Sequence, residues 1–85
     1  MRVVYKYELH FRECWVDIPG KFKCVMFDFQ NETPMLWVEV ADANAEVQRS
    51  YYVIHGTGHR IGGNEIHVSS CIQGHFVWHL YRVFK

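Results

Sequence analysis

The chain has no excess of charge of either sign across its 85 residues. Nine Lys and Arg residues balance nine Asp and Glu residues, which gives a formal net charge of zero. A protein that binds duplex nucleic acid normally carries surplus Lys and Arg to neutralise phosphates. A protein that imitates DNA would need the opposite surplus. The balance disfavours both classes, and we expect no duplex nucleic acid among the partners.

Long apolar runs are also missing. No segment approaches the roughly 18 apolar residues that a membrane-spanning helix needs. The N-terminal segment MRVVYKYELHF lacks the uninterrupted apolar stretch of a signal peptide. We therefore expect no membrane partner and a cytosolic protein.

Cysteine is scarce and irregularly spaced. Cys14, Cys24 and Cys71 are odd in number, and none of them forms a CxxC or CxxH pair. A disulfide framework favours an even number of cysteines, and a zinc site favours closely spaced pairs. The pattern is typical of free thiols in a reducing compartment.

Catalytic signatures are missing too. Ser50, Ser69 and Ser70 have no nucleophile-elbow context, and no pair of carboxylates follows a glycosidase-like pattern. Cys71 is close to histidines in the sequence, but no oxyanion donor accompanies it. We expect a protein that is not an enzyme and that needs no cofactor.

The spacing of the histidines argues against a metal site. His55 and His59 are four residues apart, as are His75 and His79. On a helix such pairs could chelate one ion, but along a strand four residues span about 13 Å. We expect no metal ligands here, with the argument weaker for His59 because it follows the strand.

Apolar and aromatic residues are what the chain has in quantity. Hydrophobic residues make up 49% of it and aromatic residues 16%, which excludes disorder. A chain of this length buries only about 60–65% of its unfolded surface, so its core is thin. We expect residues 1–85 to form a single β domain, and we expect it to self-associate to cover surplus apolar surface.

Alternation with a period of two dominates the sequence and predicts strands. In the first segment Val3, Tyr5, Tyr7, Leu9 and Phe11 share one face. The expected extended segments are VVYKYELHF (3–11), CWVDIPG (14–20), KFKCVMFDFQ (21–30), MLWVEVA (35–41), RSYYVIH (49–55), NEIHVSS (64–70) and HFVWHLYRVF (75–84).

Turn signals separate these segments. NETP (31–34) predicts a turn of four residues inside a hairpin, and IQG (72–74) predicts a tight turn. DANAEVQ (42–48) is the one place where a helical turn could form. The pattern predicts an all-β protein, a small antiparallel β-sandwich or barrel of six to seven strands with little or no helix.

The segment HGTGHRIGG (55–63) concentrates glycines and hydrogen-bond donors in one predicted loop. Its glycines can adopt positive φ and turn backbone N–H groups toward an anion. Thr57 adds a hydroxyl, His59 a titratable donor and Arg60 a planar fork that suits phosphate. It is not a Walker A loop, because no GK[ST] follows. Either it is a simple connection between strands, or Gly56, Thr57, Gly58, His59 and Arg60 bind a ligand.

Three further residues are candidates for ligand contact. Trp37 and Tyr52 face away from the core if Leu36 and Tyr51 face inward. An exposed aromatic ring can stack a nucleobase for about 1–3 kcal/mol. His79, on an otherwise apolar strand, is either a core histidine or a hydrogen-bond donor in a pocket.

Several motifs resemble a family of small bacteriophage proteins of about this length and of uncharacterised activity. They are KYEL near the start, DIPG, LWVEV, IHGTGHRI and FVWHLYRV close to the end. Members of the family read KY-x-L, a Pro-Gly turn, LW, GTGH and a terminal V-[FW]-H-[LV] strand. The resemblance implies a phage origin and the cytoplasm of an infected bacterium.

These observations lead to two functional hypotheses. In the first, a phage protein sequesters a nucleotide-derived immune signal of the host, such as a cyclic oligonucleotide or an ADP-ribose derivative, without cleaving it. Gly56, Thr57, Gly58, His59 and Arg60 would hold phosphate or ribose, and Trp37, Tyr52 and His79 would supply stacking and hydrogen bonds. In the second, the exposed aromatics form a protein-binding surface that inhibits a host factor or assists assembly.

Overall fold

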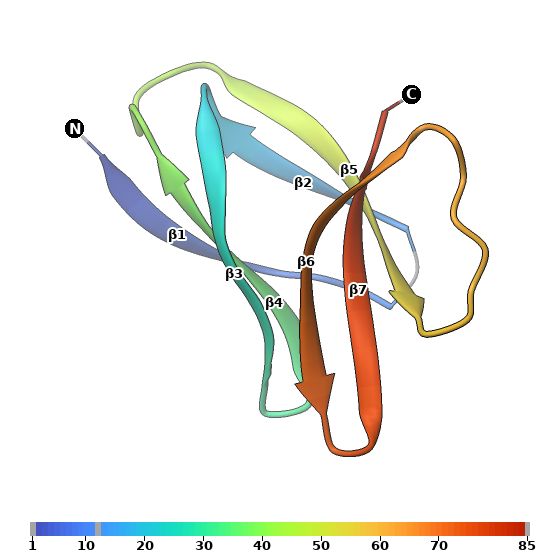
Figure 1. Cartoon of the computed structure of the whole chain (residues 1–85). Helices are drawn as coiled ribbons and strands as arrows, with labels where there is room; N and C mark the ends of the chain where they lie inside the picture. The colour runs from blue at the N-terminus through green and yellow to red at the C-terminus, as the bar shows by residue number, and fades with distance from the viewer. Residues whose placement is uncertain (1, 12, 85) are drawn as a thin grey trace.

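A computed structural model describes residues 2–11 and 13–84 of the chain and shows seven β-strands (Figure 1). The strands are β1 (Val3–Glu8), β2 (Cys14–Pro19), β3 (Phe22–Gln30), β4 (Thr33–Val40), β5 (Val47–Gly56), β6 (Glu65–Gln73) and β7 (Phe76–Val83). No helix occurs in residues 2–11 or 13–84. The prediction of an all-β chain with six to seven strands is confirmed.

The strands form two antiparallel sheets that pack face to face. A three-stranded sheet has the order β1-β4-β3, and a four-stranded sheet has the order β2-β5-β7-β6. In Figure 1 the three-stranded sheet lies on the left and the β5-β7-β6 part of the other sheet on the right. Of the two predicted architectures, a sandwich or a barrel, the structure has the antiparallel sandwich.

The core lies between the two inner faces, as the period-two pattern requires. Along β4 the buried residues Leu36, Val38 and Val40 alternate with the less buried Met35, Trp37 and Glu39. The four-stranded sheet contributes fully buried side chains from three of its strands. These are Ile18 on β2, Tyr52 on β5 and Leu80 on β7.

The hairpin turns are tighter than the sequence indicated. Asn31 and Glu32 both have positive φ, +52° and +66°, and they alone connect β3 to β4. A two-residue turn of this kind matches the twist of the flanking strands. Thr33 and Pro34 of the expected NETP turn therefore belong to β4. The β6–β7 turn likewise has two residues, Gly74 (φ +59°) and His75, so Ile72 and Gln73 of the expected IQG turn belong to β6.

The segment between β4 and β5 forms a turn instead of the helical turn that DANAEVQ allowed. The Asp42 carboxylate accepts a hydrogen bond from the Asn44 amide at 3.0 Å, and the Ala45 amide donates to the Asp42 carbonyl at 3.1 Å. A side chain that caps a nearby amide in this way competes with continued helix. The turn ends where β5 begins.

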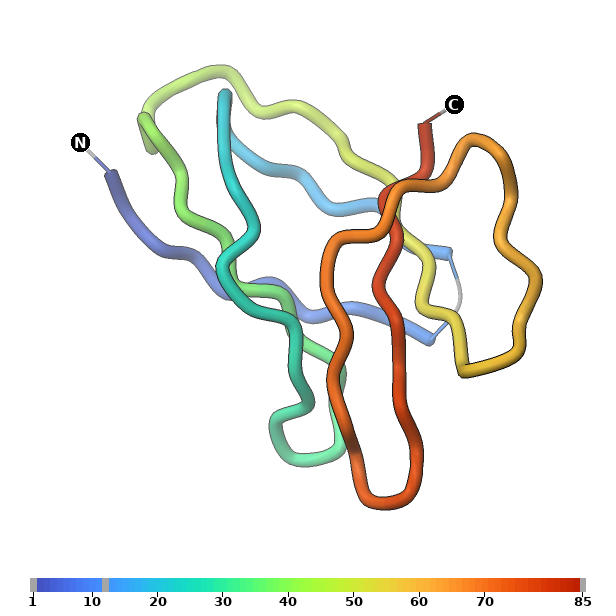
Figure 2. Tube along the Cα trace, in the orientation of Figure 1, coloured from blue at the N-terminus to red at the C-terminus, as the bar shows by residue number. Residues whose placement is uncertain are grey.

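The connection between β5 and β6 follows from the strand order. Both strands pair antiparallel with β7, which lies between them, so β5 and β6 run in the same direction. Parallel strands need a crossover connection. Residues 57–64 make it, and Figure 2 shows them returning as a wide loop from the end of β5 to the start of β6.

The thinness of the core predicts a high cost for cavities. Leu36 is fully buried at the centre of β4, so Leu36→Ala should lower the free energy of unfolding by about 2–5 kcal/mol. Equilibrium urea unfolding measures this change. Val4→Ala, at an exposed position on the adjacent strand β1, is the control and should cost less than about 1 kcal/mol. Equal losses from the two variants would contradict the assignment of the core.

Candidate functional site

The crossover loop passes over the outer face of the four-stranded sheet. Pairing of β5, β6 and β7 places His55, His67, His79 and Tyr81 on that face, opposite the core residues Ile54 and Leu80. We call these four residues the histidine face. A cavity of about 200 Å³ lies between loop and face. Its lining residues are His55, Gly56, Thr57, Gly58, His59, Ile61, His79 and Tyr81.

Glu65 fastens the far end of the loop to the sheet. One of its carboxylate oxygens contacts His55 Nε2 at 2.6 Å, and the other accepts a hydrogen bond from the Gly62 amide at 2.5 Å. A Cβ at Gly62 would lie 2.7 Å from that second oxygen, so a larger residue there would have to displace the Glu65 carboxylate. Burial raises the pKa of Glu65, but the bonds from His55 and Gly62 outweigh it and hold the pKa below its ordinary value.

The near end of the loop is shaped by glycine and by His59. Gly58 has φ +93°, a conformation that residues with a side chain rarely adopt. The Gly56 amide donates to His59 Nδ1 at 3.0 Å, and the His59 amide donates to the Gly56 carbonyl at 3.2 Å. The amides of Gly56, His59 and Gly62 are thus already bonded within the chain. A ligand would meet the remaining part of the loop, from Thr57 to Arg60.

A chain of hydrogen bonds fixes His79 at the cavity wall. Ser70 Oγ lies 2.8 Å from His67 Nε2 and 2.7 Å from His79 Nδ1. The other ring nitrogen of His79 lies 3.1 Å from Thr57 Oγ1, which is also 3.5 Å from the Val77 carbonyl oxygen. The chain joins β6, β7 and the loop across three segments of the sequence.

One assignment of protons satisfies all these contacts. A carbonyl can only accept, so Thr57 donates to Val77 and accepts from His79 Nε2–H. His79 Nδ1 is then a bare acceptor that takes the Ser70 proton, and Ser70 accepts from His67 Nε2–H. Each hydroxyl both donates and accepts, which orients the His79 ring and the Thr57 side chain without an unpaired polar atom.

A second groove of about 530 Å³ adjoins the first. Its lining residues are Gly56, Thr57, His59, His75, Phe76, Val77 and Trp78. Phe76 and Trp78 stack with ring centroids 5.7 Å apart and an interplanar angle of 27°. Phe76 is 62% exposed, so it presents an aromatic face to solvent beside the loop. The two grooves share Gly56, Thr57 and His59.

The structure brings together most of the residues that the sequence singled out. Gly56, Thr57, Gly58, His59 and His79 line one cavity, and Arg60 is exposed on the same loop. Trp37 faces away from the core, as expected, but on the outer face of the opposite sheet.

The expectation for Tyr52 is wrong. Its side chain is 0% exposed and belongs to the core, so no ring face is open to a ligand. Alternation along a strand predicts that only one of the neighbours Tyr51 and Tyr52 faces the core and is buried. Both are buried, because Tyr51 lies on the outer face against the Trp15 ring, at a centroid distance of 4.2 Å.

Several residues of the site were not singled out by the sequence. Phe76, which alternation groups on one face with Trp78 and Leu80, stands at the exposed start of β7. Glu65, His67 and Ser70 gained their roles only through strand pairing with β7. Alternation would place His67 and Ser70, three residues apart, on opposite faces, and only the register shift between His67 and Ser69 brings both onto the histidine face.

The surroundings of the thiols and of the clustered histidines bear on their reactivity and on metal binding. Burial, aided by Asp28, raises the pKa of Cys71 to about 11, so this thiol is protonated near neutral pH. All three cysteines are free thiols. In the described residues 2–11 and 13–84, no three His, Cys, Asp or Glu side chains are placed to share a metal ion.

The Glu65 contacts predict an acid-sensitive loop. Because the pKa of Glu65 in the folded protein lies below the ordinary 4.5, its contribution to stability is present above about pH 4.5 and is lost as the pH falls further. Glu65→Gln keeps an acceptor for the Gly62 amide but removes the charge beside His55. Thermal unfolding from pH 3 to 7 should show a smaller acid-dependent loss of Tm in this variant than in the wild type. Indistinguishable pH profiles would contradict the role given to Glu65.

The placement of Tyr52 gives a second prediction. Its hydroxyl lies near Cys24 and Ser50 but in hydrogen-bond geometry with neither, and burial raises its pKa. Removing a buried hydroxyl without a partner costs little, so Tyr52→Phe should leave the free energy of unfolding equal or raise it by about 1 kcal/mol. Urea unfolding measures the change, and a loss above about 1 kcal/mol would show that the hydroxyl has a stabilising partner.

No helix within the described residues is long and apolar enough to cross a membrane.

Comparisons with known proteins identify a family. Neither a curated protein nor a solved structure matches the chain. One family does match, over residues 1–85, and its description is a domain of unknown function, DUF7352. The chain belongs to the DUF7352 family.

Proposed function

We propose that this is a bacteriophage protein that binds a nucleotide-derived immune signal of the host cell and withholds it from its receptor without cleaving it. The observation that carries the proposal is the pair of adjoining grooves where the glycine loop crosses the histidine face. Together they offer an aromatic surface and a set of hydrogen-bond donors in contact with each other. A nucleotide has the matching two halves, a flat base and a phosphorylated sugar.

The aromatic half of the site would hold the base. The Phe76 ring is exposed and rests on Trp78, so a base could stack on it from the solvent side. Such stacking contributes about 1–3 kcal/mol and does not depend strongly on which base is present. In this proposal Phe76 has the stacking role that the sequence analysis predicts for Tyr52 and Trp37.

The loop half of the site would hold ribose or phosphate. Thr57 and His79 form one wall of the first cavity, and His59 belongs to both grooves. Arg60 follows on the same loop with an exposed guanidinium. The Glu65 carboxylate lies at the opposite end of the loop, bonded to Gly62, and it would repel an anion placed there. The phosphate position is therefore the Thr57–Arg60 end.

The biological part of the proposal is supported by the resemblance to small phage proteins. A binding protein of this kind acts in the cytoplasm of the infected bacterium and needs affinity but no catalytic group. Nothing in the proposed contacts requires a metal or an organic cofactor.

One observation favours a second candidate function, a protein-binding module. Ile72, Phe76 and Val77 are exposed apolar residues at the β6–β7 hairpin, and Ile72 pairs with Val77 on the outer face. Exposed apolar surface of this kind can also contact a host protein. In that case the hairpin binds a protein and the grooves stay without a nucleotide.

A screen of nucleotides tests the first function. Purified protein is mixed with cyclic dinucleotides, cyclic trinucleotides and ADP-ribose derivatives, and thermal shift and calorimetry report binding. We expect a stabilising shift with one class, and we expect the ligand to be recovered unchanged after heat denaturation. A recovered ligand with altered mass would show catalysis. The absence of a shift with every class would overturn the nucleotide proposal.

Matched variants locate the site. Phe76→Ala should weaken binding of the selected nucleotide about 5- to 150-fold, the equivalent of one stacked base. Phe84→Ala is the control, since Phe84 is also exposed (48%) but follows the far end of β7. The double variant His59→Ala with Arg60→Ala should abolish binding and lower the Tm of the free protein only slightly, because the Gly56–His59 hydrogen bond that it removes is exposed. If Phe84→Ala weakens binding as much as Phe76→Ala does, the groove is misassigned.

A further inference from the structure

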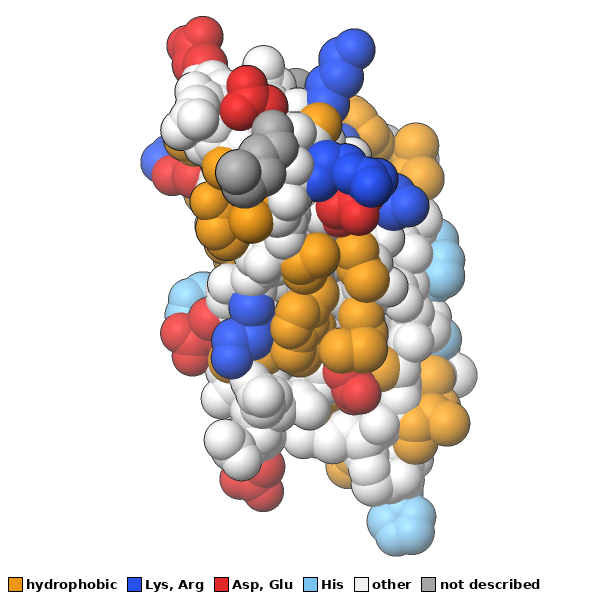
Figure 3. All heavy atoms as spheres, turned by 90° about the vertical axis from the view of Figure 1, so that its left-hand side faces the viewer, with side chains coloured by type: hydrophobic (Ala, Val, Ile, Leu, Met, Phe, Trp, Pro, Cys, Tyr) orange, Lys and Arg blue, Asp and Glu red, His pale blue; other side chains and the backbone are white. Residues whose placement is uncertain are grey.

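Basic side chains gather at one end of the sandwich. The start of β3 and the ends of β2 and β7 lie together at the top of Figure 1. Figure 3 shows Lys and Arg side chains, with acidic ones among them, in its upper part. The basic residues next to these strand ends and to the starts of β1 and β5 are Arg2, Lys21, Lys23, Arg49 and Arg82. Whether each cation is free for a ligand depends on its own partner.

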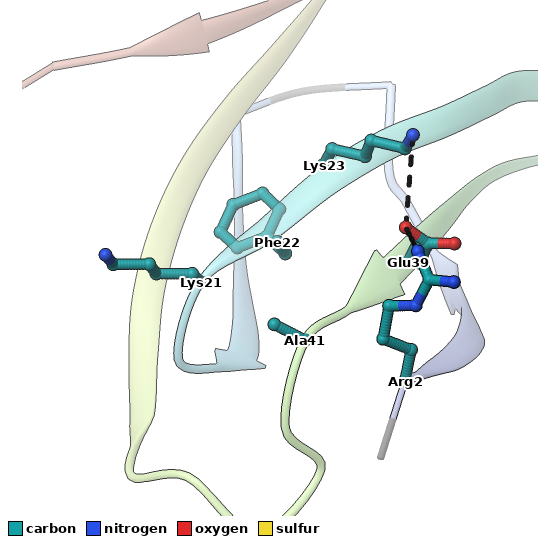
Figure 4. Close-up of a pocket in the computed structure, with 6 residues that line it drawn as sticks. All are labelled: Arg2, Lys21, Phe22, Lys23, Glu39 and Ala41. Carbon is teal, nitrogen blue, oxygen red and sulfur yellow. Dashed lines mark ion pairs between the residues drawn. The ribbon is translucent and has the colours of Figure 1, made fainter.

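The cations at the starts of β1 and β3 need no external anion. Glu39 contacts Lys23 at 3.9 Å and Arg2 at 3.7 Å, so two cations share one carboxylate (Figure 4). Lys21 is exposed and points away from this group in the same view. The hollow of about 180 Å³ that these side chains border thus contains its own carboxylate, which would repel a bound anion.

Arg82 differs from these cations because its guanidinium has no carboxylate. The side chain is partly buried, and its guanidinium carbon lies 5.4 Å from the ring centroid of Phe22 and 4.9 Å from that of Phe84. Within residues 2–11 and 13–84, the guanidinium makes no ion pair and no hydrogen bond. The two rings stabilise its charge, but they are not conventional acceptors, so five N–H donors stay without a partner from these residues.

Arg82 borders a groove of about 210 Å³ at the end of β7. We call it the arginine groove, and its lining residues are Trp15, Arg49, Ser50, Tyr51, Arg82, Val83 and Phe84. β5 pairs with β2 as far back as Val47 but with β7 only from Tyr51, so β5 projects beyond the end of β7. The backbone of residues 47–50 therefore presents N–H and C=O groups without a strand partner on this side.

Guanidinium groups reach the arginine groove from both faces of the four-stranded sheet. Arg82 pairs with the core residue Tyr52 and lies on the inner face, whereas Arg49 is two residues before Tyr51 on the outer face. The Asp17 carboxylate accepts from Arg49 Nε at 3.0 Å and from Nη2 at 3.5 Å, which leaves Nη1 for another acceptor. Asp17 and Glu13, the latter through the Tyr51 hydroxyl, contact lining residues, but no acidic residue lines the groove itself.

We propose that the arginine groove binds a phosphate group, held chiefly by Arg82 and secondly by Arg49. A tetrahedral phosphate presents oxygens in several directions, so it can accept hydrogen bonds from both guanidinium groups and from strand amides at once. A planar carboxylate matches one guanidinium fork and leaves the other without an acceptor.

The arginine groove is separate from the nucleotide site. Arg49 and Gly56 are seven residues apart on β5, which corresponds to about 23 Å along the strand. The phosphate proposal therefore does not rest on the proposed nucleotide function, and a test must report the two sites individually.

An NMR titration of the whole chain at constant ionic strength tests the groove with inorganic phosphate, methyl phosphate and acetate. We expect the Trp15 indole and Ser50 amide signals to shift saturably with both phosphates and less with acetate. The Thr57 and Gly58 amides report the loop site separately. Tighter binding of methyl phosphate indicates a phosphate monoester as the ligand, and tighter binding of inorganic phosphate indicates the free ion. No saturable shift of the Trp15 and Ser50 signals at millimolar phosphate, or acetate binding as tightly as phosphate, overturns the proposal.

Matched variants distinguish Arg82 from a general effect of charge. Arg82→Gln should weaken phosphate binding about 10- to 150-fold, the range expected for hydrogen bonds to a charged group. Arg2→Gln is the control, because it removes a cation at the same end that Glu39 already pairs, and it should change the affinity less than about twofold. Thermal unfolding checks that each variant is folded, and Arg49→Gln, at an exposed position, gives a second test with weakened binding expected. Equal losses from Arg82→Gln and Arg2→Gln, or unchanged binding in Arg49→Gln, would show that the groove is not the phosphate site.

Discussion

The parallel relation between β5 and β6 is the constraint on which the candidate site depends. Because β7 lies between them and pairs antiparallel with both, the chain must return along the sheet before β6 can begin. From Gly56 to Glu65 the straight path is about 20 Å, five residues along β7 and two strands across. The nine Cα–Cα steps available reach at most about 30 Å. The connection is therefore too short to form a helix. It crosses the outer face of the four-stranded sheet as an irregular loop, and the cavity lies beneath it.

Glycine in this loop consequently has a structural role before it has a functional one. Gly58 adopts a positive φ, and Gly62 leaves space for the Glu65 carboxylate. That carboxylate already satisfies one loop amide, so the loop is anchored by an anion of its own chain. Only the Thr57–Arg60 end is left for an external ligand. This division of one loop into an anchored end and an open end is what the nucleotide proposal uses.

The two sheets expose outer faces of different chemistry. The four-stranded sheet carries histidines joined by hydroxyl groups, which suit hydrogen bonding to a polar ligand. The three-stranded sheet carries aliphatic side chains and a tryptophan, together with Lys6 in the same row as that tryptophan. A sandwich of this size has too few residues to cover either face itself.

The sequence by itself determined the local features of this protein. Alternation of period two predicted six to seven strands and the inward face of β4, and the motif GTGH marked a loop with unusual backbone freedom. Tertiary structure decided which strands are neighbours, and therefore which residues each site residue contacts. His67 and Ser70 contact His79 only because β6 pairs with β7. It also decided that Tyr52 is buried beside an equally buried Tyr51. The reason is physical: alternation fixes which residues share a face only where a strand has no register shift such as the one between His67 and Ser69, whereas strand order depends on the burial of all strands together.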